Sequence, residues 1–262
     1  MVRITLDLSK SVEKNAEVYF NKSKKAKKKL EKTITALIRI KKRNLRFEKE
    51  RKEKRKKELE KEEELKNIPE KEWYEKFHWF TSSEDFLVIG GKDATSNEIV
   101  VKKHTDPGDI IFHTDIAGSP FFIIKTKGKK PGKATLQETA IATASYSRAW
   151  KLGISSAEVF YVNPDQVTKK AKAGEYISKG AFMVYGKKNF LKAELGLAIG
   201  LKDNKVMAAA LSAVKKHCKE YIEVQQGKEK KSATAKKIQK KIKAHVDDII
   251  RVLPTGGLNI KK

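Results

Sequence analysis

His113 and Asp115 are the residues of this chain whose types and spacing come nearest to general acid–base chemistry. Two positions apart in an expected strand, their side chains point to the same face and could share a proton. A hydrogen-bonded histidine and aspartate at the end of a strand is the more common reason for this spacing. The sequence contains no P-loop, no G-x-S-x-G motif and no zinc-ligand spacing. We therefore expect a protein that is not an enzyme and that holds no cofactor and no metal.

Lysines that lie beside glycines form a second pattern, which suits the binding of phosphate groups. Residues 127–133 (KGKKPGK) are expected to form a loop between a strand and a helix, where backbone N–H and ammonium groups can meet a phosphate. Lysines also flank residues 174–176 (GEY) and follow Gly186. Each group alone is typical of a solvated surface. Three groups with aromatic residues between them favour contact with RNA, because aromatic rings stack on unpaired bases. The candidate RNA-binding residues are Lys92, Lys127, Lys129, Lys130, Lys133, Arg148, Lys169, Lys170, Tyr176, Lys187, Lys188 and Asn189.

The elements that must position these residues are short strands and a few helices. Helical spacing predicts one helix over residues 135–152, ended by Gly153, and a basic helix over residues 232–245. A hairpin is expected around Asp203 and Asn204, which tolerate left-handed geometry. Strands and helices without a regular βαβ repeat favour the α+β class, with a compact mixed domain over residues 69–262. Further strands are expected at residues 86–89, 110–113, 121–125, 157–162, 181–185 and 221–225.

A long helical arm is expected over residues 1–68, which contain no glycine and no proline. Small and apolar residues recur there at alternating spacings of four and three, which is the heptad pattern of a coiled coil. The predicted helix runs from about residue 10 to residue 66, with Ser9 as its N-cap, and is roughly 80 Å long. A helix this polar needs a partner strand of coiled coil, although a single projecting charged helix stays the alternative. The residues expected to face a partner are Val12, Ala16, Tyr19, Ala26, Leu30, Leu37, Ile40 and Phe47.

The charge of the chain points to a polyanionic partner. Its 59 Lys and Arg against 33 Asp and Glu give a formal net charge of +26, which suits nucleic acid, a ribosome or an acidic surface. The single cysteine, Cys218, excludes an internal disulfide framework and favours a reducing compartment. The sequence has no apolar stretch of about 18 residues and no secretory signal pattern. We therefore expect a cytoplasmic protein that does not bind through a membrane span.

Several motifs follow one another in an order that resembles a known family. The first is residues 73–83 (WYEKFHWFTSS), and the others are residues 88–93 (VIGGKD), 97–98 (NE), 107–110 (PGDI), 112–115 (FHTD), 135–138 (TLQE), 147–150 (SRAW), 166–169 (QVTK), 174–176 (GEY), 180–183 (GAFM) and 186–190 (GKKNF). Together they resemble the RNA-binding domain, NFACT-R, of the NFACT family of ribosome quality control factors. On this resemblance the core motifs occupy residues 73–190, and residues 191–262 form a C-terminal extension. The arm, with residues 6–9 (LDLS), 15–16 (NA) and 19–20 (YF), is similar to the opening of the family's second coiled-coil helix.

The resemblance implies a role in ribosome-associated quality control. A family member binds a stalled large ribosomal subunit that carries peptidyl-tRNA, and recruits charged tRNA so that the nascent chain gains a non-templated C-terminal tail. The ribosome performs peptidyl transfer, so the resemblance implies a binding factor rather than an enzyme. The implied partners are tRNA and the large ribosomal subunit with its rRNA.

The match begins at the second coiled-coil helix of the family, so we expect the NFACT-N domain and the first coiled-coil helix to come from another chain. The exposed seam on the arm is the surface that such an NFACT-N partner would use. A truncated or stand-alone RNA-binding version would have the same sequence pattern. The alternative function is a basic coiled-coil adaptor or nucleic-acid-binding protein that acts without the tailing function. A hydrolase that uses His113 and Asp115 is a third, weaker hypothesis.

Overall fold

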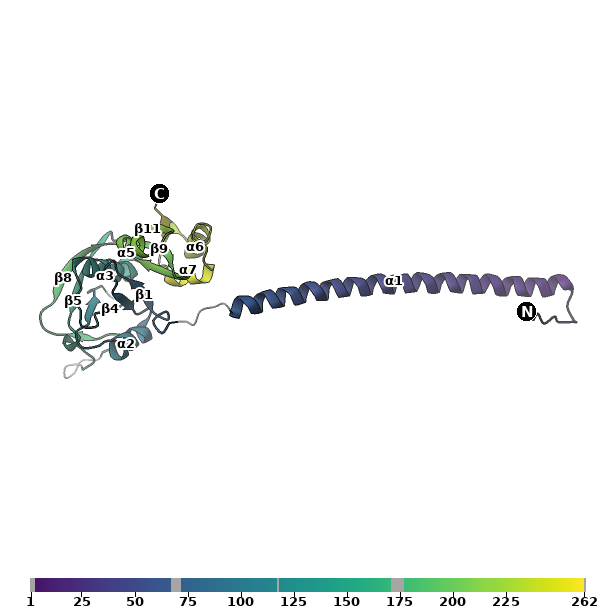
Figure 1. The fold of residues 1–262 in the computed structure, drawn as a ribbon, viewed down its shortest axis with the longest axis horizontal. Helices are drawn as coiled ribbons and strands as arrows, with labels where there is room; N and C mark the ends of the chain where they lie inside the picture. The colour runs from purple at the N-terminus through teal and green to yellow at the C-terminus, as the bar shows by residue number, and fades with distance from the viewer. Residues whose placement is uncertain (1–2, 67–71, 117, 171–176, 262) are drawn as a thin grey trace. The chain divides into compact units, whose positions relative to one another are not determined.

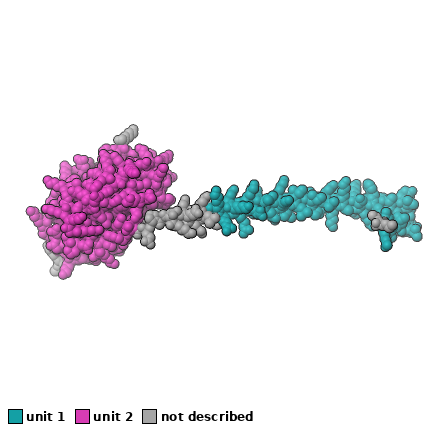
Figure 2. All heavy atoms as spheres, viewed as in Figure 1, with its two compact units in different colours: residues 1–70 teal, residues 71–262 magenta. Residues whose placement is uncertain are grey.

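The computed structural model describes residues 3–66, 72–116, 118–170 and 177–261. The chain forms two compact units, residues 1–70 and residues 71–262, which Figure 2 shows in different colours. The predicted domain boundary at residues 68 and 69 lies outside the described residues. Helices and strands mix without a βαβ repeat, and an α+β chain with a long N-terminal helix is confirmed.

The first unit is built on one helix, α1 (Val12–Lys66). It begins later than predicted because Ser11, and not Ser9, caps it: the backbone N–H of Lys14 donates to Ser11 Oγ over 3.3 Å. Ser9 instead donates its hydroxyl to Asp7 Oδ1 over 2.6 Å. Asn15 fixes the turn before the helix, since it accepts from the N–H of Asp7 and donates to the carbonyl of Asp7, each over 2.9 Å. The predicted N-cap at Ser9 was therefore wrong by two positions.

The core of the second unit is a six-stranded antiparallel sheet in the order β1-β2-β4-β3-β5-β8. Its central strand β4 is buried along its whole length, and Ile123 pairs with Ile89 on one side and Ile111 on the other. Helix α3 packs across this sheet (Figure 1), and β6 and β7 pair in a separate two-stranded sheet. The elements are β1 (His78–Thr81), β2 (Leu87–Gly90), α2 (Ala94–Lys103), β3 (Ile110–His113), β4 (Phe122–Lys125), α3 (Lys133–Tyr146), β5 (Ser156–Val162), β6 (Val167–Thr168), β7 (Met183–Val184) and β8 (Asn189–Glu194).

A second sheet, in the order β10-β9-β11-β12, is formed by the C-terminal part of the chain. The predicted hairpin is confirmed: Asp203 and Asn204 have φ of 50° and 61° and join β9 to β10. Ala235, Ile238 and Ile242 point into the apolar core under this sheet, also as predicted. The elements are β9 (Leu197–Lys202), β10 (Lys205–Ala209), α5 (Leu211–His217), β11 (Tyr221–Glu229), α6 (Lys231–Gln239), α7 (Val246–Val252) and β12 (Leu258–Ile260). The predicted helix 232–245 is thus shorter than expected.

The helix predicted over residues 135–152 is two helices, α3 and α4 (Arg148–Leu152). Ser147 breaks it with an extended backbone, φ −78° and ψ 174°, and its hydroxyl accepts from the N–H of Ala149 over 3.1 Å. A serine that can cap a new helix competes with continuation of the old one, which the apolar spacing alone does not reveal. Gly153 ends α4 in the left-handed region, φ 74°, as predicted.

Two aromatic residues near this break connect α3 and α4 to the C-terminal part of the chain. Tyr146 donates its hydroxyl to the carbonyl of Val252 over 2.6 Å, and Trp150 donates Nε1–H to the carbonyl of Gly257 over 3.0 Å. Trp150 is 2% exposed and belongs to the core of the second sheet. The segments around α7 and β12 are therefore held to α3 and α4 by the half-buried Tyr146 and the buried Trp150.

Candidate nucleic-acid interface

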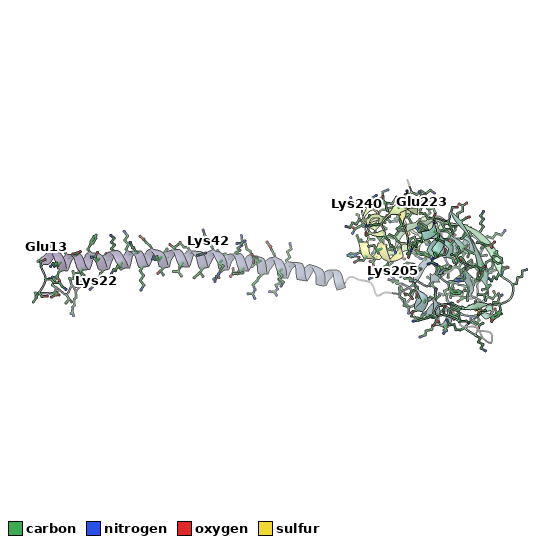
Figure 3. All side chains as sticks on the ribbon, turned by 180° about the vertical axis from the view of Figure 1, so that it is seen from behind. Glu13, Lys22, Lys42, Lys205, Glu223 and Lys240 are labelled. Carbon is green, nitrogen blue, oxygen red and sulfur yellow. The ribbon has the colours of Figure 1, made fainter. Side chains whose placement is uncertain are left out.

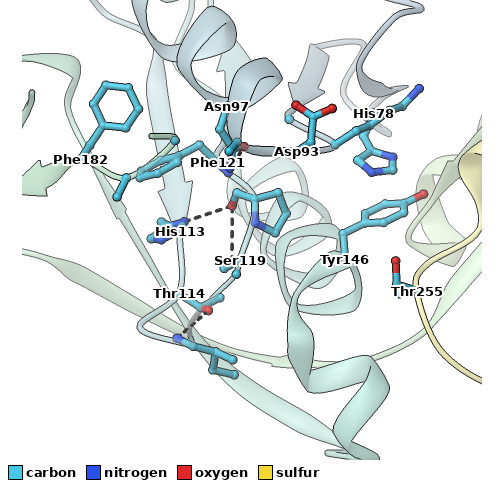
Figure 4. Close-up of a pocket in the computed structure, with 18 of the residues that line it drawn as sticks. His78, Asp93, Asn97, His113, Thr114, Ser119, Phe121, Tyr146, Phe182 and Thr255 are labelled. Atoms are coloured by element: carbon cyan, nitrogen blue, oxygen red, sulfur yellow. Dashed lines mark hydrogen bonds between the residues drawn. The ribbon is translucent and has the colours of Figure 1, made fainter. Parts of the chain in front are cut away.

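A cleft of about 770 Å³ opens in the second unit beside the six-stranded sheet. Its walls come from the turn before α2, the loop after β3, residues 178–184, the end of α3, and the start of α6 with the region around α7. Figure 4 shows His113, Phe121 and Phe182 on one side of it and His78, Tyr146 and Thr255 on the other. The cleft collects basic and aromatic side chains from segments that are far apart in the sequence.

Lys92 reaches the cleft from the turn between β2 and α2. Asp93 caps α2 by accepting from the N–H of Ser96 over 2.7 Å, and the N–H of Lys92 donates to Ser96 Oγ over 2.8 Å. Gly91 must lack a side chain, because a Cβ there would meet Asn97 Oδ1 at 2.0 Å. These contacts fix the backbone of Lys92 and leave its side chain free to face the cleft.

Residues 178–184 form a second wall and are held by Lys169. This lysine forms an ion pair with Glu98 over 2.7 Å and donates to the carbonyls of Ser178 and Ala181 over 2.9 and 2.8 Å. Gly180 has φ of 81° and approaches α2 closely, since a Cβ there would meet Ala94 Cα at 2.5 Å. The hydrogen bond from Lys169, with a second from the N–H of Gly180, lowers the pKa of Glu98 to about 2. Lys169 therefore acts first as a structural residue.

The aromatic side of the cleft contains a stacked pair of rings. His113 lies parallel to Phe121, with 3.9 Å between ring centroids and 3° between planes. Burial lowers the pKa of His113 to about 4, and Nδ1–H donates to the carbonyl of Pro120 over 3.1 Å. His113 is therefore neutral at pH 7. Asp115 pairs with Lys188 over 3.0 Å, so the hydrogen-bonded His113–Asp115 pair that the spacing suggested is not formed.

The other side of the cleft is built around His78. Its ring stacks on Tyr146 at 3.8 Å, and its Nδ1 is buried without a hydrogen-bond partner among the described residues. Burial is the main cause that lowers the pKa of His78, and the nearby charges of Lys92 and Lys231 lower it further. Both cleft histidines are thus uncharged rings at pH 7.

Three cations from different elements gather near His78. Lys92 precedes α2, Lys231 begins α6, and Arg251 lies on α7. Partial desolvation lowers the pKa of Lys92, and the charges of Arg251 and Lys231 lower it further. Desolvation also lowers the pKa of Lys231. Neither Lys231 nor Arg251 was singled out from the sequence, and the predicted basic helix at residues 232–245 lies between them without containing either.

The lysine-rich loop at residues 127–133 has a different setting. Its lysine side chains are exposed and do not line the cleft. The N–H groups at the end of the loop and the start of α3 are already used, because Glu84 accepts from the N–H of Gly132 over 3.0 Å and from the N–H of Thr135 over 3.1 Å. The hydroxyl of Thr135 also donates to Glu84 and is the main cause that lowers the pKa of this carboxyl group. This loop therefore offers exposed ammonium groups, while a carboxylate occupies the backbone donors where the loop meets α3.

The candidate RNA-binding residues fall into three groups. Lys92 and Lys188 line the cleft. Lys169 lies behind one of its walls, and Tyr176 lies outside the described residues. The exposed candidates that do not line the cleft are Lys127, Lys129, Lys130, Lys133, Arg148, Lys170, Lys187 and Asn189.

The predicted seam on α1 is exposed over most of its length. Val12, Leu30 and Leu37 are 82%, 60% and 60% exposed, and no described residue of the chain covers them. Tyr19 differs from these residues, because it is half-buried and its hydroxyl donates to the carbonyl of Thr5 over 2.6 Å. Charged side chains such as Lys22 and Lys42 project from the same helix (Figure 3). The other seam residues, Ala16, Ala26, Ile40 and Phe47, are exposed as well, with Val18, Phe20, Ile34, Ile38 and Leu45 beside them.

Two searches of the described residues bear on other kinds of site. None of the helices among residues 3–66, 72–116, 118–170 and 177–261 has the length and apolar character needed to cross a bilayer. Within those same ranges, no group of three or more His, Cys, Asp or Glu side chains is arranged to hold a metal ion.

Comparison with known proteins identifies the domain. Residues 76–186 match the NFACT protein RNA binding domain. The chain is 40% identical to the archaeal Rqc2 homolog aRqcH of Methanocaldococcus jannaschii over 201 residues, which cover 74% of this chain and 30% of the relative. It is 36% identical to the ribosome quality control complex subunit NEMF homolog of Drosophila melanogaster, over 76% of this chain and 20% of that protein. It is 38% identical to human ribosome quality control complex subunit NEMF, over 68% of this chain and 16% of that protein.

The second unit is therefore an RNA-binding domain of the NFACT type, with a cationic and aromatic cleft beside its main sheet. The chain belongs to the NFACT family, as the sequence motifs predicted. The matched region spans 16% to 30% of the length of these three relatives.

Proposed function

We propose that this chain is an RNA-binding component of ribosome-associated quality control, acting in the cytoplasm. The observation that carries the proposal is the match of residues 76–186 to the NFACT protein RNA binding domain, whose cleft gathers Lys92 and Lys188 with aromatic rings. The names of the matched relatives support the same pathway. Electrostatic attraction to phosphates would supply most of the affinity.

The partners we propose are the large ribosomal subunit with its rRNA and a tRNA. Residues 1–68 carry 24 basic and 12 acidic residues, so the arm contributes a broad, weakly selective attraction to phosphates. The exposed apolar side chains of α1 would pair with a helix of an NFACT-N domain, which supplies tRNA recruitment for C-terminal tailing. Burial of Leu30, Leu37 and Ile40 in such a coiled coil would offset the ordering of both helices.

The proposed role is binding and not catalysis. His113 donates to a backbone carbonyl, and Asp115 is paired with Lys188. With Nδ1–H donating, Nε2 is the atom left to act as a base, but burial lowers the pKa of His113 to about 4, so the ring is a weak base and has no carboxylate of its own. Substitution of His113 by alanine would therefore remove no hydrolytic activity.

Sedimentation of the full chain with purified large ribosomal subunits tests the proposal. We expect co-sedimentation at about 50 mM salt, and binding weaker by roughly a hundredfold or more at about 200 mM, because each neutralised phosphate releases a counterion. Absence of binding to both large subunits and tRNA at the lower salt concentration would refute the proposal. An unrelated monomeric helix of equal net charge is the control for attraction by charge alone.

A basic coiled-coil adaptor is the second candidate function, and the exposed apolar seam on α1 favours it. This function predicts a protein partner for the arm and no preference among nucleic acids. Affinities for tRNA and for duplex DNA of matched charge separate the two candidates, because counterion release alone gives little preference. A clear preference for tRNA supports the quality control function, and equal affinities support the adaptor.

A further inference from the structure

We infer that the cleft binds one unpaired nucleotide of an RNA strand, with the phosphate group at Lys92, Lys231 and Arg251. This inference rests on the proposed function and names the ligand of the same domain. Its basis is the composition of the cleft, which combines cations from three separate segments with uncharged aromatic rings. Figure 4 shows the rings His113, Phe121 and Phe182. A nucleotide presents both a negative charge and a flat apolar face.

The cations lack counter-charges of their own. Neither Lys92 nor Lys231 forms an ion pair with a carboxylate in the described part of the chain, and Arg251 has only a 3.6 Å contact with the exposed Asp248 on its own helix. The positive charges of the three side chains repel one another, which raises the free energy of the empty cleft. The charges of Arg251 and Lys231 both lower the pKa of Lys92. An anion between them would relieve that repulsion.

The carboxylates that line the cleft are already engaged elsewhere. Asp93 accepts from the N–H of Ser96 as the cap of α2, and Asp115 pairs with Lys188. The charge of Asp93 raises the pKa of Lys92, but desolvation and Arg251 outweigh it, and neither carboxylate forms an ion pair with any of the three cations among the described residues. Burial of Lys188 against the ring of Phe160, with 4.1 Å between Nζ and the ring centroid, holds this lysine beside the aromatic side of the cleft.

The aromatic side favours a base over a bare phosphate or an acidic peptide. His113 and Phe182 present uncharged rings, because burial lowers the pKa of His113 to about 4. Base stacking on such rings contributes roughly 1–3 kcal/mol per base. A cleft of about 770 Å³ lies within the ~300–1,000 Å³ range of small-ligand pockets, so it admits a nucleotide or two and excludes a duplex. Only an unpaired base exposes the face that the rings can meet.

Fluorescence binding of the full chain to two RNA hairpins tests this inference. One hairpin is blunt, and the other carries a short single-stranded 3′ overhang. We expect the wild-type chain to prefer the overhang by roughly tenfold. The triple variant K92A/K231A/R251A should lose this preference. The matched control K127A/K129A/K130A removes the same charge from exposed lysines outside the cleft. It should weaken binding to both hairpins by the same factor and keep the preference for the overhang.

The possible outcomes separate the two proposals. Equal wild-type affinity for both hairpins, or an unchanged preference in the cleft variant, overturns the nucleotide inference and leaves RNA binding intact. Failure of the wild-type chain to bind either hairpin at low salt overturns the proposed function and the inference with it.

A second measurement does not depend on substitutions. A 4-thiouridine in the overhang should form photo-crosslinks to the wild-type chain within residues 113–121 or 178–184. Crosslinks confined to residues 127–133 or to the arm would overturn the inference. Because the wild-type chain is used, a misfolded variant cannot produce either result.

Discussion

The arm and the globular unit carry nearly the same net charge but use it in different ways. Residues 1–68 hold 24 basic and 12 acidic residues, and the rest of the chain holds 35 and 21. On α1 the cations point outward on an element with no core, so their positions are set only by helix geometry. In the globular unit, packing of two sheets brings Lys92, Lys231 and Arg251 into one cleft. Net charge therefore predicts a kind of partner, while side-chain packing decides whether a defined binding site exists.

The largest expected effect is on the free energy of unfolding, when a buried apolar residue of the globular unit is compared with an exposed one on the arm. Trp150→Ala should lower the free energy of unfolding of the globular unit by about 3–5 kcal/mol, because a ring that is 2% exposed leaves a cavity and strands the carbonyl of Gly257. Leu37→Ala, at a side chain that is 60% exposed, should change it by less than about 0.5 kcal/mol. Urea titrations followed by near-ultraviolet circular dichroism measure both. A large loss in the Leu37 variant would mean that the arm is packed.

A smaller effect concerns the carboxylate that caps α3. Glu84→Ala should lower the free energy of unfolding by about 1 kcal/mol, since the N–H groups of Gly132 and Thr135 lose their acceptor. These contacts hold the pKa of Glu84 below its ordinary value of 4.5. The contribution of its charge is therefore complete above about pH 4.5, and is lost as the pH falls through the lower folded-state pKa.

The free energy of unfolding, measured as a function of pH, tests whether the charge of Glu84 stabilises the start of α3. The difference between wild type and Glu84→Gln should be constant near neutral pH and should shrink as the pH falls below 4.5. The exposed Glu220 gives the matched control, Glu220→Gln. A difference that stays constant to acid pH would contradict the cap.

The smallest effect is a difference in reactivity and not in stability. Cys218 is buried in the globular unit, and burial raises the pKa of its thiol to about 11. Since the thiolate is the reactive form, alkylation of the folded chain at pH 8 should be slow and should become fast in denaturant. The arm has no cysteine, so the rate of alkylation reports on the globular unit alone. Rapid alkylation of the native chain would contradict this burial.

Local signals were enough to predict many of the elements. Gly153 ends α4, and Asp203 with Asn204 turns between β9 and β10, because their backbone preferences act over a few residues. The break at Ser147 was missed, since a serine both continues an apolar pattern and caps a new helix.

The cleft was only partly predictable, because its residues meet through long-range packing. Lys188 was found by its position after a glycine, and Lys92 was among the candidates, whereas Lys231 and Arg251 come from the C-terminal helices. Glu84 reaches the start of α3 from 48 residues upstream of Gly132, and no local rule indicates that contact. Sequence patterns therefore identified the family more reliably than the residues that meet in the cleft.

The hydrogen bonds from α3 and α4 to the C-terminal sheet have a consequence for where the RNA-binding domain ends. A fragment that stopped at residue 186 would lose β8 from the edge of the main sheet. It would also leave the hydroxyl of Tyr146 and the indole N–H of Trp150 without their acceptors at Val252 and Gly257. An expression fragment, a proteolytic product or a natural gene fusion that is to keep this domain intact must therefore carry the chain through β12.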